Sequence, residues 1–344
     1  MYRYCKPIIE GLKNDNRLSL WICFPTPNKF DKQYFKEILK KIKNEVFNIQ
    51  YRIAKYLKWD LIIYPDHGPW FRKDCKKIYI SHTIWRGLYH RNKGSYRFNP
   101  KRLEIYNKIF ITSKYLYNKL ANLFPEFISI TKPVGNLLAD QLLSYTSKSE
   151  ELLEKLHFDQ NRKTIMVISS WRKNSFAQRV GIQFISLLPK LLKEYNVIFS
   201  VHQNNFINKY SPNINWKKIM EELNYDNMYF VKQREDTYKF LAVSELLITD
   251  FTSLGLFYPL LEKPIIYYNN KNVKFYKESL GLELMKYSYC IENLNHLSKD
   301  ITKAFNTFDV DKMKELKNKI FSNVENSLFF YKKEIYNTLN LPMN

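Results

Sequence analysis

The sequence predicts an α/β protein made of two halves, each with a parallel sheet covered by helices. Short apolar runs alternate with amphipathic stretches along almost the whole chain, which is typical of parallel strands and their crossover helices. The pattern stops at a polar junction, Asp159–Lys163, and then starts again. The chain has 344 residues, which is long for one core. We therefore expect an N-terminal domain over 1–158 and a C-terminal domain over 159–344, with a cleft between them.

In the first half, five runs rich in β-branched and aromatic residues are expected to be strands. They are residues 18–24, 61–64, 77–81, 108–112 and 128–134. A long basic amphipathic helix is expected from Asp31 to about Leu57, between the first two strands. A helix rich in Leu and Ser, from Leu137 to about Leu156, leads to the polar junction.

The second half repeats this order with five more strands. They are residues 164–169, 196–201, 228–231, 245–249 and 264–268. A helix from Phe176 to Glu194 separates the first two of these strands. The tail from Val310 to Leu339 also has a helical pattern, and we expect this final helical segment to cross back and brace the first half.

The composition is that of a folded and strongly basic protein. Hydrophobic residues make up 45% and aromatic residues 16%, which argues against intrinsic disorder. Lys and Arg number 55 against 33 Asp and Glu, so the formal charge is +22. Such a field attracts nucleic acid, an anionic membrane or a phosphorylated substrate. The simpler alternative is that the lysines form solvated helix faces.

Cysteine usage and the N-terminus favour a cytoplasmic location. The four cysteines are far apart and lack metal-ligand spacing, so we expect reduced thiols. The first residues lack the pattern of a secretory signal, and no run approaches the roughly 18–20 apolar residues of a membrane span. Any membrane contact is expected to be peripheral.

The stretch Glu245–Tyr268 predicts a phosphate site. It reads as a buried strand, a polar turn, a short apolar helix over 254–261 and a second buried strand. Asp250, Thr252 and Ser253 lie in the turn, where the N–H groups at a helix start favour an anion. The alternative is that a hydroxyl in the turn only caps the helix.

Two other loops of the second half are expected at the same sheet edge. Ser170–Lys173 follows the first strand and His202–Asn204 follows the second. With the turn after 245–249 they supply cations, an imidazole, amides, a carboxylate and hydroxyls, which together suit a nucleotide diphosphate. Arg172 would hold phosphate oxygens as a fork and Lys173 as a point charge.

Loops after strands of the first half carry further candidates, because open α/β sheets bind ligands beyond the carboxyl ends of their strands. These candidates are His67, His82, Gly135 and Asn136. Three tryptophans near the loops could stack on a base or pack in the core. They are Trp70, Trp85 and Trp171.

The order of these motifs resembles the CDP-glycerol:poly(glycerophosphate) glycerophosphotransferases, which build teichoic acids and related capsular polymers. The resemblance covers roughly residues 76–270. In the first half, His82 matches the His of the family's Trp-His-Gly loop, and Gly135 with Asp140 matches its Gly-x-Pro-Arg-x-Asp turn. In the second half, Trp171-Arg172 matches the family's Thr-Trp-Arg motif and His202 matches the His of its His-Pro motif. Thr249–Ser253 matches the family's Ser-Asp-Tyr-Ser-Ser motif. The chain departs from these motifs at Thr83, Leu137, Leu138, Gln203 and Thr249, and its hydroxyl pair is Thr252-Ser253. These departures leave the donor and acceptor open.

The resemblance implies a GT-B architecture, in which two Rossmann-like domains face a central cleft. The N-terminal domain would take the acceptor and the C-terminal domain the nucleotide donor. The implied reaction moves glycerol phosphate, or a related polyol phosphate, from a CDP-activated donor to a hydroxyl of a cell-surface polymer or lipid-linked acceptor, releasing CMP. The residues expected to bind the donor are Trp171, Arg172, Lys173, Asp250, Thr252 and Ser253.

The resemblance also assigns the imidazoles. His82 would take the acceptor proton, because an ordinary imidazole pKa of about 6.5 suits a base near neutral pH. His67 is the alternative base. His202 would stabilise the transferring phosphoryl group or the departing phosphate. No Asp-x-Asp pair is well placed, so neither a metal nor another cofactor is implied.

Two other functions compete with this one. A GT-B glycosyltransferase of capsule or lipopolysaccharide synthesis would use a nucleotide-activated sugar, because the fold does not fix the group that is carried. A nucleic-acid module is not expected, because only the stretch 51–58 interleaves basic and aromatic residues. Under the main hypothesis, the 31–57 helix or the basic C-terminal tail docks on the anionic cytoplasmic leaflet, where each Lys or Arg contributes about 1 kcal/mol.

Overall fold

The computed structural model describes residues 2–24, 32–42, 46–65, 71–80, 84, 103–275 and 279–343. These residues form two compact units. Unit 1 holds the described residues of Met1–Thr83, Phe98–Leu138 and Phe321–Asn344, and unit 2 those of Ile84–Arg97 and Ala139–Ile320. The division at Leu138 comes earlier than the predicted 158/159 boundary. The reason is packing, because helix α7 (Ser149–Lys155) lies against α11 (Thr237–Val243) of unit 2.

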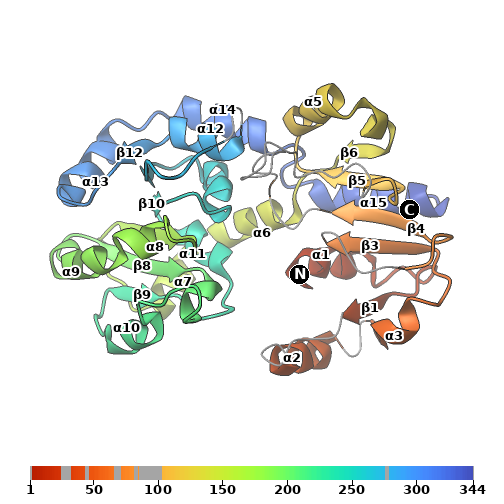
Figure 1. The fold of residues 1–344 in the computed structure, drawn as a ribbon, viewed down its shortest axis with the longest axis horizontal. Coiled ribbons are helices and arrows are strands. Elements are labelled where there is room, and N and C mark those ends of the chain that lie inside the picture. Colours follow the sequence, from red (N-terminus) through yellow and green to blue (C-terminus); the bar gives the residue numbers. More distant parts are fainter. Residues whose placement is uncertain are drawn as a thin grey trace. The chain divides into compact units, whose positions relative to one another are not determined.

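Unit 1 is built on parallel strands (Figure 1). One sheet has the order β3-β4-β5-β6 and a second pairs β1 with β2. The strands are β1 (Trp21–Phe24), β2 (Phe47–Gln50), β3 (Leu61–Pro65), β4 (Lys76–Ile80), β5 (Lys108–Ile111) and β6 (Thr131–Pro133). The helices are α1 (Tyr2–Leu12), α2 (Lys32–Ile42), α3 (Tyr51–Ala54), α5 (Lys114–Leu123), the 3₁₀ helix η2 (Pro125–Ile130), the first residues of α6 (Leu137–Thr146) and α15 (Ser327–Leu339).

The single long helix predicted over residues 31–57 is wrong. Helix α2 ends at Ile42, and β2 then pairs in parallel with β1, with Trp21 opposite Phe47. Strand pairing explains the difference, because the β-branched and aromatic side chains around β2 fit a pleated surface as well as a helix face.

The C-terminal helix α15 belongs to unit 1. Its Ile335 and Tyr336 are buried in one cluster with Ile78 of β4 and Phe110 of β5. The ring of Tyr331 meets the ring of Phe110 edge to face at 5.0 Å between centroids. The chain therefore returns to its first half at α15, whereas the preceding helix α14 (Val310–Ile320) stays in unit 2.

Unit 2 contains a six-stranded parallel sheet with the order β12-β11-β10-β7-β8-β9 (Figure 1). The strands are β7 (Thr164–Ser169), β8 (Asn196–Val201), β9 (Met228–Phe230), β10 (Leu246–Thr249), β11 (Ile265–Tyr268) and β12 (Tyr289–Ile291). The remaining helices are α8 (Phe176–Arg179), α9 (Gly181–Leu191), η3 (Gln203–Phe206), α10 (Trp216–Glu222), η4 (Leu254–Leu261), α12 (Leu280–Lys286) and α13 (Leu297–Asn306). The five predicted strands are present, and β12 is an additional one.

Helices cover this sheet on both faces, so its central strands are apolar throughout. Every residue of β7 and β8 is buried, as expected for parallel strands between two helical layers. On one face, Phe184 of α9 and Trp216 of α10 pack with Phe199 of β8, and none of the three is exposed. Burial of one such side chain contributes about 1.5–3 kcal/mol. This rigid core fixes the loops at the carboxyl edge.

Candidate functional site

The strand order of unit 2 brings three polar loops together. Strand β7 lies between β10 and β8, and all three run parallel. The loops that follow them, Ser170–Ser175, His202–Asn205 and Asp250–Ser253, therefore leave the same edge of the sheet as neighbours. This neighbourhood is the one predicted from the sequence, and we call these residues the edge loops.

Asp250 holds two of the edge loops together from inside. Its side chain is 0% exposed. It accepts hydrogen bonds from the Ser169 hydroxyl (2.8 Å) and from the backbone N–H groups of Ser170 (3.0 Å), Phe176 (2.8 Å) and Thr252 (2.9 Å). The predicted phosphate contact of Asp250 does not fit this position. A buried carboxylate that accepts from four donor groups orders the loops and does not face a ligand.

The loop after β7 presents an aromatic ring and two cations. Trp171 is half-buried, and its ring lies 4.9 Å from the Tyr210 ring and 6.1 Å from the His202 ring. The guanidinium carbon of Arg172 lies 5.5 Å from the centre of the Trp171 ring. Arg172 and Lys173 are exposed, and neither pairs with a carboxylate among the described residues. Both cations are therefore available to an anion. Sequence reasoning missed Tyr210, which lies outside the predicted loops.

His202 is exposed at the end of β8 and is held by its own loop. Its Nδ1 accepts a hydrogen bond from the backbone N–H of Asn204 at 3.1 Å. A ring nitrogen that accepts an N–H carries no proton, so the neutral imidazole has its proton on Nε2. In this tautomer, His202 is a hydrogen-bond donor through Nε2.

The turn after β10 supplies two hydroxyls. Neither the Thr252 nor the Ser253 hydroxyl makes a hydrogen bond within the described part of the chain, and Ser253 precedes η4 without capping it through its side chain. The predicted short helix at 254–261 is present as η4. Gly255 allows its close approach to the sheet, because a Cβ there would lie 3.2 Å from the Thr249 side chain. The capping alternative is therefore not observed for Ser253.

Positive and negative side chains both lie near this edge of the sheet. Burial raises the pKa of Tyr268, at the end of β11, while Arg179 lowers it and the Asp250 carboxylate raises it. The phenol therefore stays protonated at neutral pH. Arg179 thus adds a third cation near the edge, beyond the two that the sequence analysis identified.

The structure describes some of the candidate residues of unit 1 and not others. His67, His82, Trp70 and Trp85 lie outside the described residues. Gly135 and Asn136 are buried against the start of α15, where the Asn136 N–H donates to the Ser327 hydroxyl at 3.0 Å. Gly135 has φ = +95°, and a Cβ there would lie 2.5 Å from that hydroxyl oxygen. Both residues therefore have a packing role in unit 1. Because they are buried, they do not present the surface that their predicted role in ligand binding requires.

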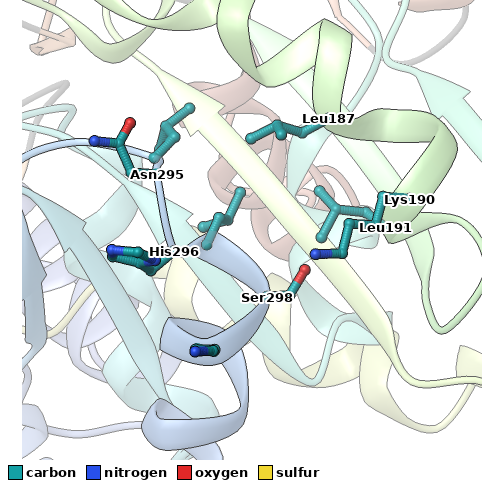
Figure 2. Close-up of a pocket in the computed structure, with 9 residues that line it drawn as sticks. Leu187, Lys190, Leu191, Asn295, His296 and Ser298 are labelled. Carbon is teal, nitrogen blue, oxygen red and sulfur yellow. The ribbon is translucent and has the colours of Figure 1, made fainter.

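A small cavity of unit 2 lies away from the edge loops. Leu187, Lys190 and Leu191 of α9 line one side, and Asn295, His296 and Ser298 at the start of α13 line the other (Figure 2). Its volume of about 90 Å³ is well below the roughly 300 Å³ of a small-molecule site. It does not hold a nucleotide.

The described residues contain neither a cluster of metal ligands nor a helix that could span a membrane. No group of three or more His, Cys, Asp or Glu side chains is arranged to bind a metal ion there. Among the helices described, none has the length and apolar run needed to cross a membrane.

A known protein family matches most of the chain, including this site. The family model for CDP-glycerol:poly(glycerophosphate) glycerophosphotransferases matches residues 85–322. A teichoic acid poly(glycerol phosphate) polymerase of Bacillus spizizenii is 24% identical over 286 residues. The match covers 77% of this chain but only 57% of that relative.

Solved structures show the same fold. The H548A variant of the wall teichoic acid polymerase TagF has a TM-score of 0.67 at 14% identity, covering 98% of this chain and 95% of that one. A TagF H444N structure soaked with CDPG has a TM-score of 0.61 at 14% identity, covering 98% and 94%. UDP-GlcNAc 2-epimerase from Methanocaldococcus jannaschii has a TM-score of 0.58 at 16% identity, covering 97% and 96%. These similarities confirm the predicted GT-B-like α/β fold.

Proposed function

Because the chain belongs to the CDP-glycerol:poly(glycerophosphate) glycerophosphotransferase family, we propose that it transfers glycerol phosphate, or a related polyol phosphate, from a CDP-activated donor. The acceptor is a hydroxyl of a cell-surface polymer or lipid-linked molecule, and CMP is released. The family match over residues 85–322 carries this proposal, since it includes all three edge loops. CDPG in a TagF structure supports the choice of donor.

The reaction is a displacement at phosphorus. A base removes the proton of the acceptor hydroxyl, whose oxygen attacks the phosphorus that bears the glycerol. A new P–O bond forms, the P–O bond to CMP breaks, and CMP leaves as a phosphate monoester. Such a transfer depends mainly on positioning and on stabilisation of phosphate charge.

The edge loops suit the donor half of this reaction. Arg172 and Lys173 would bind diphosphate oxygens, and the Thr252 and Ser253 hydroxyls would donate to them. His202, as an Nε2–H donor, would stabilise the oxygen between the two phosphorus atoms as CMP leaves. We keep His82 as the proposed base, with His67 as its alternative. Asp250 acts through the loops that it orders.

A donor panel tests the proposed function. Purified protein is incubated with a lipid-linked glycerol phosphate acceptor and, separately, CDP-glycerol, CDP-ribitol, UDP-sugars and a CMP-sugar. We expect CMP release only with the CDP-polyols, coupled to transfer of phosphorus to the acceptor. Turnover of a nucleotide sugar with both CDP-polyols intact would instead identify a glycosyltransferase.

We also propose that the protein docks on the anionic inner face of the plasma membrane. Five of the exposed apolar side chains of unit 1, each 42–62% exposed, belong to β1, β2, α3 and the residues just after α3. We call them the aromatic patch: Trp21, Phe47, Ile53, Tyr56 and Leu57. The rings of Trp21 and Phe47 stack at 4.7 Å, and the Lys55 ammonium lies 4.5 Å from the centre of the Tyr56 ring. Aromatic rings beside cations suit a membrane interface, and the net charge of +22 has the matching sign.

Vesicle sedimentation tests this docking. The double variant Phe47→Ser/Tyr56→Ser should bind anionic vesicles at least about tenfold more weakly, because burying one such ring contributes about 1.5–3 kcal/mol and a decade is about 1.4. Tyr225→Ser is the matched control, since Tyr225 is 40% exposed on unit 2, outside both the patch and the C-terminal tail. Binding that is indifferent to anionic lipid, or equal losses in both variants, would contradict the proposal.

A further inference from the structure

A buried side-chain amide joins two of the edge loops. Asn205 is 1% exposed. Its Nδ2 donates to the Ser170 carbonyl at 3.0 Å, and its Oδ1 accepts from Nε2 of Gln178 at 2.8 Å. Ser170 directly precedes Trp171 and Arg172 in the chain. The Asn205 amide therefore ties the loop after β8 to the backbone that carries the cations.

Gln178 extends this connection to a third segment. Its Nε2 also donates to the Ser211 hydroxyl at 2.9 Å, and that hydroxyl donates to the Ile214 carbonyl at 3.0 Å. Ser211 is 2% exposed and follows Tyr210, whose ring packs on Trp171. One chain of hydrogen bonds thus connects α8, η3 and the segment that carries Tyr210. We call Gln178, Asn205 and Ser211 the amide network.

The amide network also reaches His202. The backbone N–H of Asn205 donates to the His202 carbonyl at 2.8 Å. Asn205 is therefore bonded on one side to the backbone of the imidazole and on the other to the backbone just before Arg172. Its side chain must donate and accept at once, which an amide does and a carboxylate or an apolar group does not. A buried polar network of this kind holds a single arrangement only while it is fully satisfied.

We propose that Asn205 and Gln178 are positioning residues that set the spacing between Arg172 and His202 for a nucleotide diphosphate. This inference rests on the proposed function. Neither residue touches the ligand. Each acts by fixing the loop that presents Arg172, so their contribution to binding passes through that cation.

Calorimetric binding of CMP and CDP-glycerol to the full chain tests the inference. Asn205→Asp keeps the shape of the side chain but turns an acceptor toward the Ser170 carbonyl. We expect binding about 10- to 100-fold weaker, the size of effect that a misplaced group produces. Asn208→Asp is the matched control, because it adds the same charge three residues further along the chain, at an exposed position outside the edge loops, and it should bind like the wild type. If Asn205→Asp does not fold, Gln178→Glu makes the same test from the other end of the bond.

A double-mutant cycle separates positioning from general loosening. Arg172→Ala alone should weaken CMP binding. When Asn205→Asp is added to the Arg172→Ala variant, binding should change less than about twofold, because the effects of coupled residues are not additive. Losses that add, or wild-type binding in both network variants, would overturn the inference while leaving the proposed function intact. A wild-type protein that binds neither CMP nor CDP-glycerol would overturn both.

Discussion

Replacing His202 by Ala is expected to lower the kcat for CMP release about 10²–10³-fold, the usual cost of losing one preorganised donor to developing charge. The reason lies in its tautomer. Nδ1 accepts from the Asn204 N–H, so in the neutral ring the proton lies on Nε2, the nitrogen that we propose as the donor to the phosphates. The KM for the CDP-donor should change much less than kcat, because the stabilised charge develops mainly in the transition state. Steady-state CMP release measures both constants.

A further substitution tests whether His202 donates a hydrogen bond or transfers a proton. His202→Gln retains an N–H near the position of Nε2, so it should be more active than His202→Ala if donation is the role. His296→Ala is the matched control, because His296 is an exposed histidine of unit 2 outside the edge loops. Wild-type kcat in His202→Ala would remove this residue from the mechanism.

The proposed base is tested in the same assay. His82→Ala should lower kcat about 10²–10⁴-fold, the range of general acid–base catalysis, and should abolish the limb of the pH–rate profile that reports the base. If His67→Ala loses that limb and His82→Ala keeps it, the two assignments are exchanged. Activity retained in both His82→Ala and His202→Ala would dismiss the mechanism.

The sequence was sufficient to predict the edge loops because the strands of unit 2 are unambiguous. β7 and β8 have the predicted bounds, and fully apolar runs between amphipathic helices leave few alternatives. The position of β12 was not predicted, since its three residues, Tyr289–Ile291, are too few for a periodic signal. In unit 1, the sequence pattern predicts a helix where β2 lies, because the pairing of β2 with β1 is a tertiary contact that the local pattern does not contain.

The role of each polar side chain within a loop was harder to predict than the loop itself. Asp250 and Thr252 are two residues apart in one turn, yet the Asp250 carboxylate points into the protein and the Thr252 hydroxyl has no partner among the described residues. The direction of a side chain depends on turn geometry, which motif spacing does not specify. Asn205 was missed for the same reason, because nothing in sequence distinguishes a buried, doubly bonded amide from an exposed one.

Replacing Asp250 by Ala is expected to lower the free energy of unfolding of unit 2 by about 4 kcal/mol or more. Four donor groups, those of Ser169, Ser170, Phe176 and Thr252, lose their common acceptor, and a buried donor left unsatisfied costs about 1–3 kcal/mol. Asp250→Asn should lose most of the same amount, because its amide turns an N–H toward groups that are themselves donors. Urea unfolding followed by tryptophan fluorescence and circular dichroism measures the change.

The control and the binding data separate this structural role from the ligand contact first predicted for Asp250. Asp226→Ala removes an exposed carboxylate of unit 2 and should leave the unfolding midpoint unchanged within about 0.5 kcal/mol. If Asp250→Asn unfolds like the wild type but no longer binds CDP-glycerol, the carboxylate acts on the ligand directly and the structural assignment is wrong. If stability and binding fall together, and saturating CMP restores part of the lost stability, the carboxylate orders the loops that bind the nucleotide. The restoration is expected because a ligand that binds only the folded state stabilises that state.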